Sequence, residues 1–98
     1  MFIPITDVVY TMMAERDFYR VWKRISKTGF GATFSLGVDL HISIKEIDEY
    51  IEIFRLAKLI TVKSYEILGA EYSVCEDSVT LGKNILKLSA KFHEGDIR

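Results

Sequence analysis

Apolar residues recur at helical spacing in the middle of the chain. Ser43 precedes this run and Glu46 follows three positions later, which is the arrangement of a capping box at a helix start. When the chain advances about 100° per residue, the apolar positions fall on one side; they are Ile44, Ile47, Tyr50, Ile51, Phe54 and Ala57. The pattern predicts a helix over residues 43–58.

After this helix the pattern changes to that of a β-hairpin. Strand-favouring residues gather on both sides of Gly69, which permits a turn; they are Leu59, Ile60, Val62 and Tyr65 before it, and Tyr72 and Val74 after it. The predicted tip, residues 66–71, carries no base, and Lys63 is the nearest one. Ile67 and Leu68 make the tip apolar, so it either folds back onto the core or contacts a protein.

Two helices are predicted before this unit. The first is capped by Thr6 or Asp7, and its inner face is formed by Val8, Val9, Met12 and Met13. The second covers residues 15–28 and ends at Gly29. Its apolar side holds Phe18, Val21, Trp22 and Ile25, whereas its opposite side holds Arg16, Arg20, Lys23, Arg24 and Lys27. We predict that Trp22 and Phe54 are core residues.

The two remaining segments differ in character. Residues 29–41 hold three of the six glycines, so we predict a loop with a short extended piece near 33–36. The last helix is predicted from Asp77 or Ser78 to Phe92. Apolar residues cover more than half of its circumference, which is more than a small core can bury. We therefore expect residues 78–92 to form a homodimer interface centred on Leu81, Ile85, Leu88 and Phe92.

Composition limits the class of protein. Ninety-eight residues, 49% hydrophobic and 28% charged, describe one globular domain over residues 1–98. No apolar run reaches the roughly 20 residues of a membrane span, and no signal-peptide pattern is present, so we expect a cytoplasmic protein without a membrane partner. Cys75 is the single cysteine, and neither His41 nor His93 has a partner at metal-ligand spacing. With no catalytic or cofactor motif either, we expect no metal, no cofactor and no enzyme activity.

Charge is unevenly distributed along the chain, although the net charge is only −1. Residues 1–28 carry five bases and three acids, whereas residues 29–58 carry three bases and five acids. The basic side of helix 15–28 is open to three interpretations: a solvated surface, a phosphate-binding face or a membrane-surface helix. The outer side of helix 43–58 is acidic overall and is equally consistent with a solvated face; it holds Lys45, Asp48, Glu49, Glu52 and Arg55.

The order of these elements resembles the winged helix-turn-helix regulators, in particular small archaeal plasmid and viral DNA-binding proteins and the PadR-like group. The segment from Phe54 to Ile60 is similar to the family's helix end, L-x-x-x-G-L-I, with Lys58 in place of glycine. Tyr72 to Cys75, and displaced from it Thr80 to Gly82, loosely match the family's wing segment. The resemblance implies an α+β fold with a three-helix core, a two-stranded wing and a C-terminal helix.

It also implies a function: a homodimeric, sequence-specific regulator or DNA-organising factor, associated with the nucleoid, on an inverted repeat of double-stranded DNA. On that basis Ser43 and Lys45 read bases, and Arg55 and the wing residue Lys63 contact phosphates. We expect the basic side of helix 15–28 to add most of the affinity through phosphates. The alternative is a winged-helix module that binds a protein and not DNA, through the acidic helix and the apolar hairpin tip.

Overall fold

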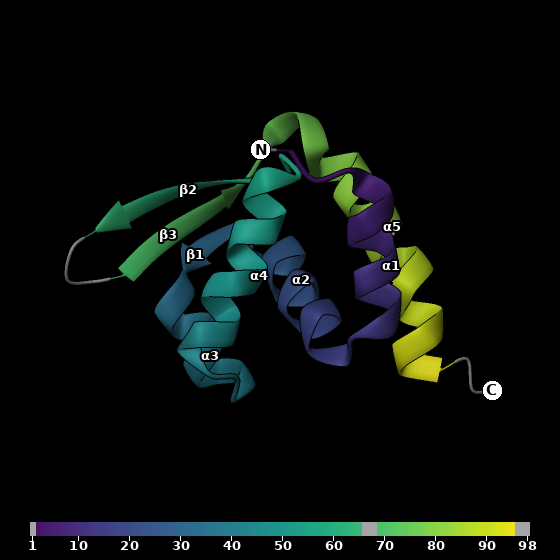
Figure 1. Ribbon diagram of the computed structural model, residues 1–98, viewed down its shortest axis with the longest axis horizontal. Coiled ribbons are helices and arrows are strands. Elements are labelled where there is room, and N and C mark those ends of the chain that lie inside the picture. The colour runs from purple at the N-terminus through teal and green to yellow at the C-terminus, as the bar shows by residue number, and fades with distance from the viewer. Residues whose placement is uncertain (1, 66–68, 96–98) are drawn as a thin grey trace.

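The computed structural model describes residues 2–65 and 69–95, and it shows helices packed beside a three-stranded antiparallel sheet (Figure 1). The helices and strands are, in order, α1 (Ile5–Ala14), α2 (Arg16–Thr28), β1 (Phe30–Ala32), α3 (Thr33–Leu40), α4 (Ile44–Leu56), β2 (Ile60–Tyr65), β3 (Gly69–Val74) and α5 (Val79–Ala90). A 3-10 turn, η1 (Glu76–Ser78), precedes α5, and a π-helical turn, η2 (Lys91–Gly95), follows it. The expected α+β class is confirmed.

Helix α4 begins where its capping residue predicts. The Glu46 backbone N–H donates to Ser43 Oγ over 3.2 Å, which satisfies one of the free donors at the helix start. The helix ends at Leu56, two residues before the predicted end. Lys58 then adopts a left-handed conformation with φ of 63°, and this turns the chain into β2. The lysine therefore occupies a backbone position that suits glycine.

The predicted loop over residues 29–41 is wrong, because the segment contains β1 and α3. Gly29 ends α2 with φ of 81° and leads directly into β1. Thr33, Leu36 and Leu40 recur at helical spacing, and all three are buried in α3. The predicted extended piece at 33–36 is helical, and the strand lies just before it. The glycines of this segment led to the loop prediction, and the short helix buries only a narrow stripe of residues.

The sheet has the order β1-β3-β2, so the first strand lies outside the hairpin and pairs with β3. Gly31 faces Tyr72 in the register, and a Cβ there would lie 2.7 Å from Tyr72 Oη, so a larger residue would displace the buried tyrosine. Strand β3 begins at Gly69, earlier than the predicted start at Tyr72. The predicted apolar tip, Ile67 and Leu68, lies outside the described residues.

Aromatic side chains join the helices at the centre of the core. The Phe18 and Phe54 rings stack with centroids 4.6 Å apart, and the Trp22 ring lies 4.9 Å from Phe54. The side chains of Trp22 and Phe54 are fully buried, so both core predictions are confirmed. Trp22 Nε1 donates to the Gly82 carbonyl over 2.9 Å. The indole therefore fastens α5 to α2.

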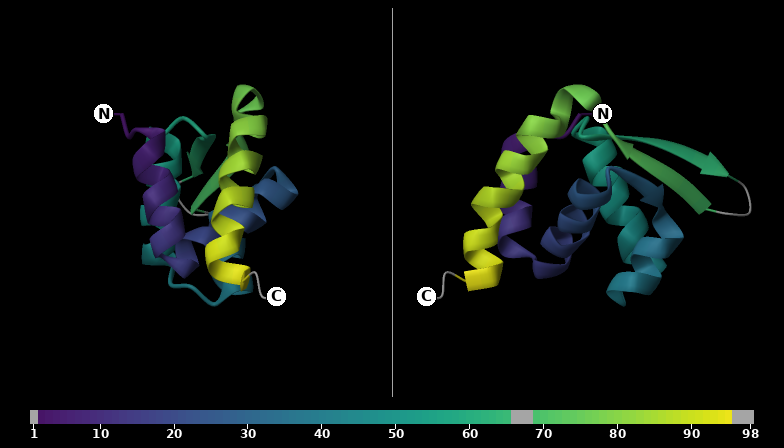
Figure 2. Two further views of the ribbon diagram at one scale, coloured as in Figure 1. Left: turned by 90° about the vertical axis from the view of Figure 1, so that its right-hand side faces the viewer. Right: turned by 180° about the vertical axis from the view of Figure 1, so that it is seen from behind.

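Helices α1 and α5 lie side by side at the end of the molecule away from the hairpin (Figure 1, Figure 2). Helix α1 starts at Ile5 with Pro4 in the N-cap position, so the predicted cap at Thr6 or Asp7 is wrong. Val8 and Met12 are fully buried, while the other two residues of the predicted inner face are only partly buried. Helix α5 ends at Ala90, so the predicted helix end falls within η2.

Candidate nucleic-acid interface

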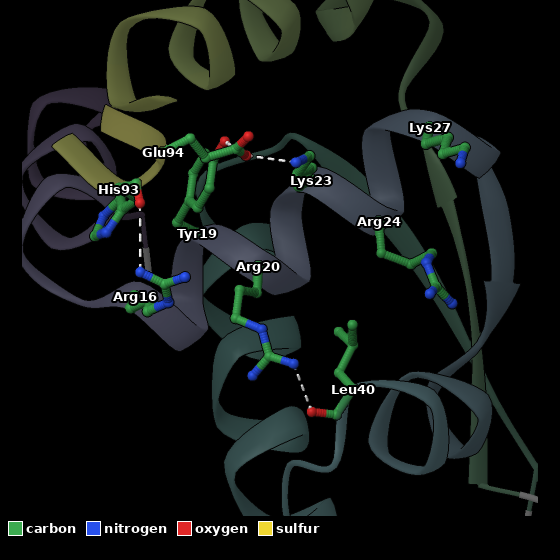
Figure 3. Close-up of a pocket in the computed structure, with 9 residues that line it drawn as sticks. All are labelled: Arg16, Tyr19, Arg20, Lys23, Arg24, Lys27, Leu40, His93 and Glu94. Carbon is green, nitrogen blue, oxygen red and sulfur yellow. Dashed lines mark hydrogen bonds and ion pairs between the residues drawn. The ribbon is translucent and has the colours of Figure 1, made fainter. Parts of the chain in front are cut away.

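The basic side of α2 borders an open groove of about 700 Å³. The core side of α2 is buried, which turns the five cations outward on the opposite side of the helix. Tyr19 of α2 also lines the groove, and the other groove residues come from the end of α3 and from η2 (Figure 3). The groove residues are Arg16, Tyr19, Arg20, Lys23, Arg24, Lys27, Leu40, His93 and Glu94. The structure thus brings together all five cations of the predicted phosphate-binding face.

At one end of the groove, η2 lies against α2. The Glu94 carboxylate accepts hydrogen bonds from Lys23 Nζ and Tyr19 Oη, and Arg16 Nη1 donates to the His93 carbonyl over 3.3 Å. The His93 ring stacks on Tyr19 with centroids 4.8 Å apart. His93 Nε2 lies 2.6 Å from the Met12 carbonyl; because a carbonyl only accepts, this nitrogen carries the proton.

Ionisation reinforces these contacts. The hydrogen bonds from Lys23 and then Tyr19 hold the pKa of Glu94 below its ordinary value. Burial, followed by the hydrogen bond to Glu94, raises the pKa of Tyr19 to about 12. At neutral pH the groove therefore holds a carboxylate beside a protonated phenol.

Toward the other end, the cations face α3. Arg20 donates to Asp17 over 3.0 Å and to the Leu40 carbonyl over 2.8 Å, which ties α2 to the end of α3. Arg24 pairs with Asp39 at 2.9 Å. Within the part of the chain that the structure describes, Lys27 has no ion-pair partner.

The ion pairs of the groove are open to solvent. Side-chain exposure is 53% and 45% for Lys23 and Glu94, and 34% and 50% for Arg24 and Asp39. Exposed pairs of this kind contribute about 0–1 kcal/mol each. An incoming anion can therefore replace these carboxylates at small cost.

The outer side of α4 has a different character. The Ser43 hydroxyl is engaged at the helix start, and Arg55 Nε donates to Glu52 Oε1 over 2.8 Å, which lowers the pKa of Glu52. Lys45 is exposed and is followed by Asp48 and Glu49. A hollow on this side is lined by Ile44, Lys45, Asp48, Glu49, Glu52 and Ile53. The predicted base-reading surface is therefore acidic and partly apolar.

The structure does not bring the two predicted DNA surfaces together. Phe18 and Trp22 of α2 meet Phe54 of α4 across the core, so each helix exposes the side that faces away from this contact. The described residues that line the α2 groove and the α4 hollow do not overlap. Lys63 lies apart from both on the sheet, opposite Glu71 in the register.

The predicted dimer residues divide into two groups. Leu81, Leu88 and Phe92 are 40%, 47% and 59% exposed. Ile85 is only 3% exposed and belongs to the core of its own chain, so its prediction as an interface residue is wrong. Apolar residues cover a large part of α5 because one side of this helix packs on α2 and α1.

Sequence reasoning missed the groove residues contributed by other elements. The sequence pattern gives no role to Glu94, and His93 has none beyond that of a histidine without a metal-ligand partner. The bond from Lys23 to Glu94 spans 71 residues, and that from Arg16 to His93 spans 77. No local pattern carries that information.

Other kinds of site find no support in the described ranges. No three metal-binding side chains cluster within residues 2–65 and 69–95. Over the same residues, the helices are too short or too polar to cross a bilayer. No protein-family model, curated protein or solved structure matches this chain.

Proposed function

We propose that this chain is a winged-helix protein that binds double-stranded DNA by its phosphate backbone, through the basic groove of α2. The order α2-β1-α3-α4-β2-β3 and the strand order β1-β3-β2 support the winged-helix part of the proposal. The observation that carries the DNA-binding part is the gathering of five cations on one side of α2, beside an open groove.

The dimensions of the groove suit a phosphate backbone. From Arg16 to Lys27 the helix rises by roughly 16 Å, and a duplex carries about ten phosphate charges over that length. Each cation that neutralises a phosphate releases bound counterions, which makes the affinity steeply dependent on salt. The ion-pair partners of Lys23 and Arg24 are half-exposed carboxylates, and a phosphate can replace them.

Backbone contact of this kind carries little sequence preference, so it favours a DNA-organising factor over an operator-specific regulator. Base reading by Ser43 and Lys45 is disfavoured on two grounds. The serine hydroxyl already caps α4, and the lysine is surrounded by acids. Neither residue lines the α2 groove.

We also propose a homodimer formed through α5. Leu81, Leu88 and Phe92 lie at helical spacing and are exposed, and a second copy would cover them. Phe92 directly precedes His93, so this interface would adjoin the groove and bring the grooves of two copies close together. Leu88→Glu should shift sedimentation toward the monomer, whereas Lys87→Glu, on another side of α5, should not. A parent chain that is monomeric at high concentration would refute the dimer.

The DNA-binding proposal is tested by two matched double variants. Arg24→Ala with Lys27→Ala removes two charges from the groove, and Lys45→Ala with Arg55→Ala removes two charges from α4. The groove variant should weaken binding to every duplex and reduce the salt slope by about one for each phosphate that is no longer neutralised. The α4 variant should bind as the parent does. If only the α4 variant loses affinity, the duplex lies on the other face and the groove proposal is wrong.

One observation favours a second candidate function, the binding of a basic amphipathic helix by the α3–α4 surface. Phe34, Val38 and Ile44 are 64%, 56% and 48% exposed, and acids of α4 lie beside Ile44. An apolar strip with an acidic rim is complementary to a helix that carries apolar and basic residues. A synthetic peptide of that pattern should bind the parent chain and lose binding to Ile44→Asp. Equal binding to the parent and the variant would exclude this candidate.

A further inference from the structure

The C-terminal turn η2 places a carboxylate within the basic groove. Glu94 accepts hydrogen bonds from Lys23 and Tyr19, and the neighbouring His93 carbonyl accepts one from Arg16. We infer that the Glu94 carboxylate occupies a phosphate-binding position of the groove, so that η2 is a built-in competitor which DNA must displace. This inference rests on the proposed function of the groove.

The groups around Glu94 are those that bind a phosphate. Carboxylates and phosphates both accept charge-assisted hydrogen bonds from lysine, arginine and tyrosine. With η2 in place Tyr19 is 3% exposed, and its ring stacks on that of His93. A phenol ionises only at about pH 10, so this hydroxyl is a donor at any physiological pH, with or without Glu94 beside it. The lysine, arginine and tyrosine donors all lie on α2, so they stay on one side of the same helix when η2 leaves.

Release of the turn uncovers the Tyr19 ring but gives up few other apolar contacts. Phe92 is 59% exposed, and Lys91 and Glu94 are exposed as well, so η2 buries little apolar surface. It is held instead by polar contacts and by the stack of His93 on Tyr19. The last buried side chain before the turn is Ser89 in α5. Release of residues 91–95 therefore leaves the contact of α5 with Trp22 intact.

The test measures duplex affinity for the parent chain, Glu94→Gln and Asp17→Asn. Asp17 also pairs with a groove cation, so Asp17→Asn is a matched control for the loss of one negative charge. Glu94→Gln should bind about three- to tenfold more tightly than the parent, as expected when an exposed ion pair and a hydrogen bond no longer compete. Asp17→Asn should show a smaller gain.

A second readout follows the turn itself by proton NMR. Ring currents from Tyr19 shift the His93 ring signals, and His41, exposed at the end of α3, is an internal control. Addition of duplex should move the His93 signals toward those of a free histidine and leave His41 unchanged. This readout does not depend on any variant.

The outcomes separate the inference from the proposed function. If the parent binds DNA while His93 stays in place and Glu94→Gln gains no more than Asp17→Asn, the inference is overturned and the DNA-binding proposal stands. If neither the parent nor Glu94→Gln binds any duplex at low salt, the proposed function fails and the inference fails with it. Binding by Glu94→Gln alone would support both.

Discussion

The contact between α2 and α5 can be tested with Gly82→Ala. A Cβ at Gly82 would lie 2.6 Å from Trp22 Cζ2, well inside van der Waals contact. The indole cannot swing away, because it is fully buried and bonded through Nε1 to the Gly82 carbonyl. We therefore expect α5 to shift outward and the packing around Trp22 to loosen.

Two opposing effects decide the magnitude. In a helix interior, alanine is more favourable than glycine by about 1 kcal/mol. Overpacking costs about 1–3 kcal/mol, and a weakened buried hydrogen bond adds about 1 kcal/mol. The net expectation for Gly82→Ala is a loss of about 1–3 kcal/mol, which lowers Tm by roughly 5–25 °C in a domain of this size.

Thermal unfolding followed by circular dichroism measures this change. Asn84→Ala, at an exposed position of the same helix, is the control and should stabilise by a few tenths of a kcal/mol. Gly82→Ala combined with Trp22→Phe should lose less than the sum of the two single changes, because the smaller ring makes room for the methyl group. If Gly82→Ala melts at or above the parent Tm, helix propensity dominates and the close contact does not exist as described.

Three further predictions use other features. Ser89 is fully buried and, among the described residues, its Oγ has no hydrogen-bond partner, so Ser89→Ala should raise stability by about 1 kcal/mol; an unchanged Tm would contradict this. Lys58→Gly should raise the free energy of unfolding by about 0.5–1 kcal/mol and so raise the denaturant midpoint. The reason is that relief of the left-handed strain exceeds the stabilisation from the exposed cation–π interaction with Phe2; a lower midpoint would show that the cation–π interaction is the larger effect. In a phenolate absorbance titration, Tyr19 should ionise with a pKa of about 12, and this step should be missing from the titration of Tyr19→Phe. Because folding raises this pKa above the ordinary 10, its contribution to stability should be complete below about pH 10 and be lost between about pH 10 and 12; loss at lower pH would contradict the burial of the phenol.

The elements with strong periodic contrast could be predicted from the sequence. Helix α2 separates its apolar and basic residues almost completely, and α4 adds the capping residue Ser43. Helix α3 could not be predicted in the same way, because Phe34 and Val38 are apolar yet exposed and Gly37 interrupts the helical composition. The buried side of α3 can be identified only once the position of the sheet is known.

The groove, too, could be predicted from the sequence only in part. Its cations lie on one helix and follow from periodicity alone. Its carboxylates, Asp39 and Glu94, come from α3 and η2, and their positions depend on how those elements pack on α2. Similarly, the broad apolar coverage of α5 does not distinguish Ile85, which is buried in its own chain, from Leu88, which is exposed.

The bond from Trp22 to the Gly82 carbonyl has a consequence for the order of folding. It spans 60 residues, so it can close only after α5 has left the ribosome or, in refolding, after a long loop has formed. Local helices such as α2 and α4 form without it. Because Trp22 is the single tryptophan, its fluorescence reports the docking of α5 and should lag behind the gain of helical circular dichroism. The chain thus carries an intrinsic probe of its last folding step.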